Sequence, residues 1–428
     1  MYISREAEKR TQELSSRGRE DRLSALRKLK AEADAGAVVL PQPGPDVNNH
    51  IHTVYSFSPY TPAMAVWKAK EAGLSTAGII DHDSVSGVEE FRLAGAIMDM
   101  PVTTGLEIRS GHSDTRIGER RTNNPDQGGI SYLTLHGVPA GALEAVRAFL
   151  APINEARGAR NRRMCARIGE VSGVGLDYDA DVVSLSMAHE GGSVTERHLL
   201  FALANRLIDD FGKGRALGSR IDGFMELGAA DEKLIMDEDD PWYDYHLLGV
   251  LKARFVDSFY LPASDAECPA IEEVAAFAEE NDIILTYPYL GDVGQSVTMD
   301  KRPQTFEDGY LDVLFDELAA LGFRAVSYMP SRNTPGQIAR IREFCERYDM
   351  LQITGEDINT PFQPFICTAQ RDPSFMNLHD SAWALIGHEI ATEREPSDSF
   401  LRLNLPLNEK VRHFKNIAFE ACKGNQDR

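Results

Sequence analysis

The chain has 428 residues, of which 43% are hydrophobic and 26% charged, so it is long enough for a large core and about two or three domains. Its formal net charge of −21 and pI of about 5.0 argue against a general nucleic-acid-binding protein, which needs a basic face. Five scattered cysteines without a Cys-x-x-Cys pair, no signal-peptide pattern and no long apolar stretch predict a soluble cytoplasmic protein that crosses no membrane.

The first forty residues are predicted to form a charged helical arm. Leu23, Leu26 and Leu29 recur at helical spacing, and Gly36 is a stop signal for the helix. We expect the arm to pack on the outside of the main domain or on a second subunit, so a homo-oligomer remains an open alternative.

Short strands and helices then alternate along most of the chain. This rhythm predicts an α/β fold, with a parallel sheet that closes or nearly closes into a barrel over residues 46–154 and 263–370. A mainly helical insertion is predicted at 155–262 and a C-terminal extension at 371–428. The predicted strands are 50–55, 76–81, 102–108, 282–288, 323–329 and 350–357, and the helices are 62–74, 88–98, 270–281, 314–322 and 339–348.

Polar residues follow the strands at the points where they end, which is where α/β folds build their sites. His50 and His52 are two residues apart in a strand, so their imidazoles point the same way and suit a metal ion. Glu107, His136 and Asp357 stand at later strand ends. The sequence therefore predicts a metal site of mixed imidazole and carboxylate ligands, which fits Mn, Fe or Zn.

Five motifs carry a resemblance to a known family: HIHTVYS, GLSTAGIIDHDSVSG, TTGLE, LHG and LQITGED. Together they resemble the PHP (polymerase and histidinol phosphatase) superfamily. The resemblance implies a distorted seven-stranded (β/α) TIM-like barrel with two or three metal ions. The block from RNRRMCARIGEVSGVGL to SVTERHLLFAL is similar to the helical insertion of its small-molecule phosphoesterase branch.

The resemblance implies a ligand set and a reaction. One ion would be held by His50, His52 and Asp357, and Glu107 would bridge to a second ion bound by His136 and His198. Two divalent transition-metal ions would support hydrolysis of a small phosphorylated metabolite through a metal-bound hydroxide.

Three positions depart from the family pattern. Phe57 stands where an Asp is usual, Tyr287 replaces the His of Ala-His-Pro, and Asn359 replaces the His of Gly-Ser-Asp-x-His. Phenylalanine cannot coordinate a metal and a neutral amide coordinates a soft metal poorly, so we expect no third ion. His82 and Tyr287 are then predicted to be catalytic, donating to a phosphate oxygen or protonating a leaving group.

An anionic substrate needs partners of opposite charge. The predicted substrate-binding residues are Arg160, Arg163, Arg116, Arg120 and Asn359. For the four arginines, a position at the solvated surface without a role in substrate binding is an equal alternative.

Two other functions remain open. The loss of third-ion ligands leaves room for hydrolysis of a C–N or C–O bond, as amidohydrolase barrels perform. A binding or regulatory protein could also retain a metal site without turnover.

Overall fold

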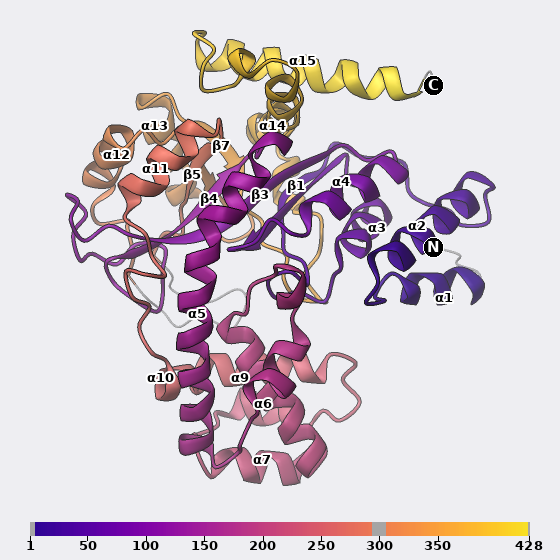
Figure 1. Ribbon diagram of the computed structural model, residues 1–428, viewed down its shortest axis with the longest axis vertical. Coiled ribbons are helices and arrows are strands. Elements are labelled where there is room, and N and C mark those ends of the chain that lie inside the picture. The colour runs from indigo at the N-terminus through magenta and orange to yellow at the C-terminus, as the bar shows by residue number, and fades with distance from the viewer. Residues whose placement is uncertain (1–4, 293–304, 427–428) are drawn as a thin grey trace.

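The computed structural model describes residues 5–292 and 305–426 and has one seven-stranded sheet in the order β1 to β7 (Figure 1). The sheet curls into a nearly closed barrel, which confirms the predicted α/β fold. The strands are β1 Val47–Ile51, β2 Thr76–His82, β3 Val102–Gly111, β4 Ile130–His136, β5 Ile284–Pro288, β6 Ala325–Tyr328 and β7 Leu351–Thr354.

One strand runs against the others. β4 pairs antiparallel with both β3 and β5, while the remaining neighbours are parallel. The expectation of a parallel sheet is therefore wrong for β4. A parallel pair needs a long crossover connection, which is usually a helix. The polar segment 112–129 between β3 and β4 contains no helix.

The barrel closes between β1 and the segment that follows β7. The amide of His52 donates to the carbonyl oxygen of Ile358 at 3.0 Å, and the amide of Ile358 donates to that of His50 at 3.0 Å. This closure brings Asp357 next to the two histidines of the first motif.

Five helices follow or precede the strands and cover the barrel. The first shows how the sequence sets their ends: Thr61 accepts a hydrogen bond from the amide of Met64, Pro62 occupies the first turn, and Gly73 ends the helix with φ of 85°. The five are α3 Pro62–Ala72, α4 Val88–Ile97, α11 Ile271–Glu280, α12 Leu311–Ala320 and α13 Pro335–Arg347.

The predicted insertion forms a helical body below the barrel (Figure 1). It has its own hydrophobic core, built mainly from residues between 164 and 259. The 30-residue helix α5, Leu143–Ser172, runs without a break through residue 155 and so belongs to both parts. The other helices are α6 Glu196–Phe211, α7 Arg215–Asp222, α8 Ala229–Met236, α9 Tyr243–Arg254 and α10 Val256–Phe259.

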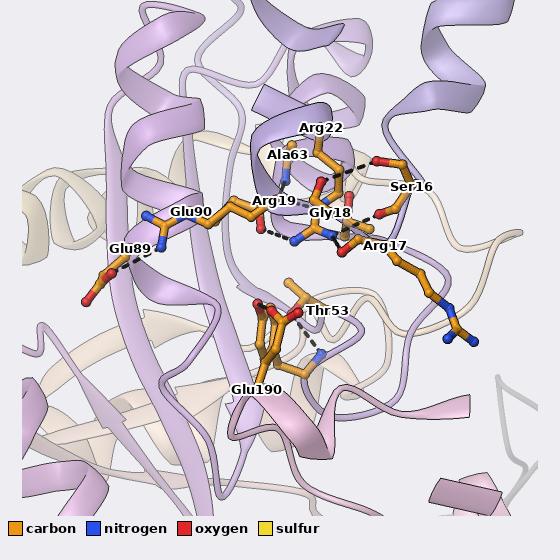
Figure 2. A network of polar contacts seen from close by, with 12 residues as sticks. Ser16, Arg17, Gly18, Arg19, Arg22, Thr53, Ala63, Glu89, Glu90 and Glu190 are labelled. Atoms are coloured by element: carbon orange, nitrogen blue, oxygen red, sulfur yellow. Dashed lines mark hydrogen bonds and ion pairs between the residues drawn. The ribbon is translucent and has the colours of Figure 1, made fainter. Parts of the chain in front are cut away.

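The N-terminal helices α1, Arg5–Glu13, and α2, Arg19–Asp34, pack beside α3 and α4. Leu23, Leu26 and Leu29 share the barrel's hydrophobic core. Arg22 is fully buried, where it pairs with Glu90 through two nitrogens, one at 2.9 Å, and donates to the carbonyl of Ser16 at 2.9 Å (Figure 2). The arm is thus bonded into the main domain.

The C-terminal helices α14, Met376–Arg394, and α15, Leu407–Gln426, cross on the opposite side of the barrel from the insertion. Gly387 allows their close approach, because a Cβ there would lie 1.7 Å from the carbonyl oxygen of Phe414. Glu389 accepts from Thr103 Oγ1 at 2.6 Å and from the amide of Thr104 at 2.8 Å. No helix in the described ranges is long and apolar enough to span a membrane.

Candidate metal centre

His52 is held in one orientation by a chain of buried hydrogen bonds. Asp81, at the end of β2, accepts from the Ser56 hydroxyl at 2.6 Å and from the Thr53 hydroxyl at 2.6 Å. Since the Ser56 proton points to Asp81, its Oγ is left to accept from His52 Nδ1, 3.3 Å away. With a metal bound, the neutral ring would carry its proton on Nδ1 and present the lone pair of Nε2 to the ion.

Glu107 gathers the histidines around one carboxylate oxygen. Its Oε2 lies 3.2 Å from His50 Nε2 and 3.9 Å from His52 Nε2, and the ligand atoms of these three residues lie within 4.8 Å of one another. Burial alone would raise the pKa of Glu107, but His82, His50 and His52 bring it down to about 2. The carboxylate is therefore ionised and ready to bind a cation.

Asp357 completes this group from the far end of the chain. Its Oδ1 lies 3.3 Å from His52 Nε2. Asn359 donates to both carboxylate oxygens of Asp357 at 2.9 Å and so orients this candidate metal ligand. Asn359, which is predicted to bind substrate, also lines the pocket. Burial would raise the pKa of Asp357, but His52, His50 and Arg197 lower it overall.

His136 lies deeper in the barrel than Glu107. It pairs with Gly105 across β3 and β4, two residues before Glu107, and therefore shares a face with the glutamate. Neither ring nitrogen has a hydrogen-bond partner among the residues that the structure describes, and burial lowers the pKa of His136 to about 3. A buried, neutral imidazole without partners next to Glu107 fits a metal ligand.

The donor set thus matches a divalent transition metal. Imidazole nitrogens and ionised carboxylates are the ligands that Mn, Fe and Zn share, and the fixed tautomer of His52 is the one that coordination requires. His50, His52, Glu107 and Asp357 converge, and His136 stands beside them.

His82, which the resemblance associates with a third ion, lines the pocket. Its ring stacks on His52, with centroids 4.7 Å apart, and its Nδ1 lies 3.8 Å from Glu107 Oε2. Burial lowers the pKa of His82 to about 3. Phe57 packs against Phe201 and Tyr245 in the insertion, which leaves His82 without a third-ion partner at that position.

His198 and Tyr287 are not brought to the cluster. His198 lies in the first turn of α6, where its Nδ1 accepts from the amide of Thr195 at 3.0 Å and its ring makes a T-shaped contact with Phe57. The hydroxyl of Tyr287 lies 3.4 Å from Glu307 Oε1, and burial raises the pKa of Tyr287 well above its usual value. The roles assigned to both residues from the sequence stay predictions.

The four predicted arginines lie away from the pocket lining. Arg160 is buried and donates to Glu267 at 2.6 Å, whereas Arg163 is exposed on α5. Arg116 is 61% exposed and pairs with Asp316, and Arg120 donates to the carbonyl of Arg116 at 2.7 Å.

Three other cations line the pocket, together with His50, His82 and Glu107. Arg197 comes from the start of α6, Lys252 from α9, and Arg332 from the segment after β6. The position of Arg332 after a strand is a signal that sequence reasoning could have used. Arg197 and Lys252 depend on how the insertion folds over the barrel, and no local pattern marks them.

A buried network of charges joins the centre to the insertion. Asp83, next to His82, forms an ion pair with Arg157 of α5, and Glu267 pairs with Arg109 at 3.2 Å and with Arg160 at 2.6 Å. Asp83 has a φ of 47°, an uncommon conformation for a residue other than glycine, and Asn154 donates to its carbonyl at 2.9 Å. The long helix is thus fixed to the strands that carry the histidines.

No family model matches the chain, and no curated protein matches it. Among solved structures, a candidate metal-dependent phosphoesterase from Bifidobacterium adolescentis is 21% identical, with a TM-score of 0.50 over 76% of this chain and 91% of that one. An amidohydrolase from Chromobacterium violaceum, with bound sulfate and no metal, is 16% identical, with a TM-score of 0.49 over 74% of this chain and 89% of that one. The first likeness shows a shared fold.

Proposed function

We propose that the protein is a metal-dependent hydrolase that cleaves a phosphate ester of a small metabolite. The observation that carries the proposal is the convergence of His50, His52, Glu107 and Asp357 at the mouth of the barrel, with His52 held in the coordinating tautomer. The proposal is also supported by the similar fold of a protein described as a metal-dependent phosphoesterase.

The residues of the pocket are proposed to have separate roles. When bound, divalent ions supply Lewis acidity and activate water, and we propose two of them, Mn, Fe or Zn. Arg197, Lys252 and Arg332 are proposed to bind the anionic oxygens of the substrate, because all three line the same pocket as Glu107. His82, exposed to this pocket, is proposed to donate a hydrogen bond to the reacting group.

The same centre supports a second candidate, hydrolysis of a C–N or C–O bond. The observation in its favour is that Phe57 belongs to the core of the insertion, so position 57 contributes no ligand to the third ion that the resemblance associates with phosphate chemistry.

A substrate panel separates these functions. Purified protein loaded with Mn²⁺, Fe²⁺ or Zn²⁺ is assayed on phosphate monoesters and diesters, amides and lactones. We expect turnover of a phosphate ester, and a loss of at least about 100-fold in Glu107→Gln, because a ligand is removed. Glu346→Gln, the same change on the exposed face of α13, is the matched control. Turnover of amides or lactones alone supports the second candidate, and metal binding without any hydrolysis supports a regulatory protein.

The setting of this activity is also part of the proposal. All five cysteines are free, and Cys165, Cys268 and Cys345 are buried, which suits reduced thiols in a cytoplasm. The acidic chain is proposed to bind a small anionic metabolite and no nucleic acid, with a homo-oligomer still an open alternative.

A further inference from the structure

The ligand atoms are distributed unequally around Glu107. Its carboxylate, His50 and His52 lie within 4.8 Å of one another, and Asp357 approaches His52 to 3.3 Å. An ion among these three side chains would have Asp357, next to His52, as the candidate for a fourth ligand.

A second ion next to Glu107 would meet fewer protein side chains than the first. His136 is the candidate that the structure supplies, because it shares the face of Glu107 and both of its ring nitrogens are buried without partners in the described ranges. Glu107 and His136 together give that position two side chains.

His198, which the sequence assigns to this second ion, has the wrong tautomer for it. A backbone amide can only donate, so the bond from Thr195 makes Nδ1 the acceptor and leaves the proton of the neutral ring on Nε2. An Nε2–H group has no lone pair to offer a metal. The hydroxyl of Thr195, 3.2 Å from the same Nδ1, holds this arrangement further.

Tyr287 does not replace the missing donor. Its side chain is 1% exposed and its hydroxyl lies 3.4 Å from Glu307 Oε1, outside the lining of the pocket that holds His50 and Glu107. A phenol in this apolar, carboxylate-facing position retains its proton.

We infer that the centre is asymmetric: one divalent ion binds tightly to His50, His52, Glu107 and Asp357, and a second binds weakly to Glu107 and His136 until an anionic ligand supplies further oxygens. This deepens the metal-dependent function proposed above and rests on it. Since the anion would help to hold the second ion, that ion would be recruited together with substrate.

The test counts ions and does not depend on turnover. Protein stripped of metal is titrated calorimetrically with Mn²⁺, with and without inorganic phosphate, and the ions retained after dialysis are measured by mass spectrometry. We expect one retained ion, a second that binds at least about tenfold more weakly, and tighter binding of the second in phosphate. Two ions of equal affinity without phosphate, or a second ion indifferent to phosphate, would overturn the inference.

Two variants identify the donors. His136→Gln should remove the second binding event and leave the tight ion. His198→Gln should change neither, because glutamine at this position preserves the capping box with Thr195. Loss of an ion in His198→Gln would overturn the assignment. Thermal melting of both variants checks the fold. An asymmetric centre in a protein without esterase activity would contradict only the proposed function.

Discussion

Ser56 contacts Nδ1 of His52, which leaves Nε2 as the nitrogen available to the metal centre. The serine donates its proton to Asp81 at 2.6 Å, so its oxygen accepts from His52 Nδ1 at 3.3 Å. The opposite arrangement holds at His198, whose Nδ1 accepts from a backbone amide. Two buried histidines of one chain are thus set in opposite tautomers by their neighbours, and only one of them is prepared to coordinate.

Ser56→Ala is expected to weaken metal binding by about 10–100-fold, because His52 loses the acceptor that fixes its tautomer. Calorimetric titration with Mn²⁺ measures the effect. Ser58→Ala is the control, since that hydroxyl accepts from the amide of Tyr60 at 3.3 Å. Equal affinity in the two variants would show that Ser56 does not orient His52.

Arg197→Ala, Lys252→Ala and Arg332→Ala should each raise KM for an anionic substrate by roughly 10–100-fold, because each removes a charge-assisted hydrogen bond. Arg163→Ala, an exposed cation on α5, should leave KM unchanged. Steady-state kinetics on the substrate found in the panel decides between the arginines of the pocket and those expected from the sequence. A large effect in Arg163→Ala alone would restore the sequence-based assignment.

Arg22→Met is expected to destabilise the protein by about 3–5 kcal/mol, because Glu90 is left as a buried carboxylate without its charge partner. Arg19→Met is the matched control: Arg19 pairs with Glu89 at the surface and should cost about 1 kcal/mol or less. Thermal and denaturant unfolding measure both. Similar small losses would mean that the arm contributes little to the main domain.

Glu307 predicts a dependence of stability on pH. Burial raises the pKa of this carboxyl from 4.5 to about 7, so between these values the folded state holds a proton that the unfolded state releases. Stability should therefore fall as pH rises through this window, by about 3 kcal/mol from this group. Glu307→Gln keeps an acceptor for the amide of Leu290 and should lose this dependence. Melting temperatures of the wild type and the variant are compared from pH 4.5 to 8. The same dependence on pH in both proteins would contradict the prediction.

The barrel and four candidate ligands could be predicted from the sequence, because local patterns mark both. Alternation of strands and helices gave the fold, and strand ends gave His50, His52, Glu107 and Asp357, which the structure brings together. β4 is not among the predicted strands, and its antiparallel direction was missed as well, since the residues on either side of the polar segment 112–129 look alike whichever way the strand runs.

The cations were harder to predict because their roles depend on distant partners. Arg160 has the spacing of an anion-binding residue, yet Glu267, 107 positions later, neutralises it in the interior. Arg197 and Lys252 gain their place only when two helices of the insertion fold against the barrel mouth. Spacing along one helix does not contain this information.

The two hydrophobic cores meet in one pocket, and this has a mechanical consequence. Arg197 and Lys252 belong to helices of the insertion, whereas Arg332 and Asp357 follow strands of the barrel. A ligand that contacts all four would act as a further cross-link between two bodies that already share α5, its buried ion pairs and direct hydrogen bonds such as that from Ser193 to the carbonyl of His82. Ligand binding should then raise the melting temperature and slow amide exchange in α6 and α9 together with the strand ends.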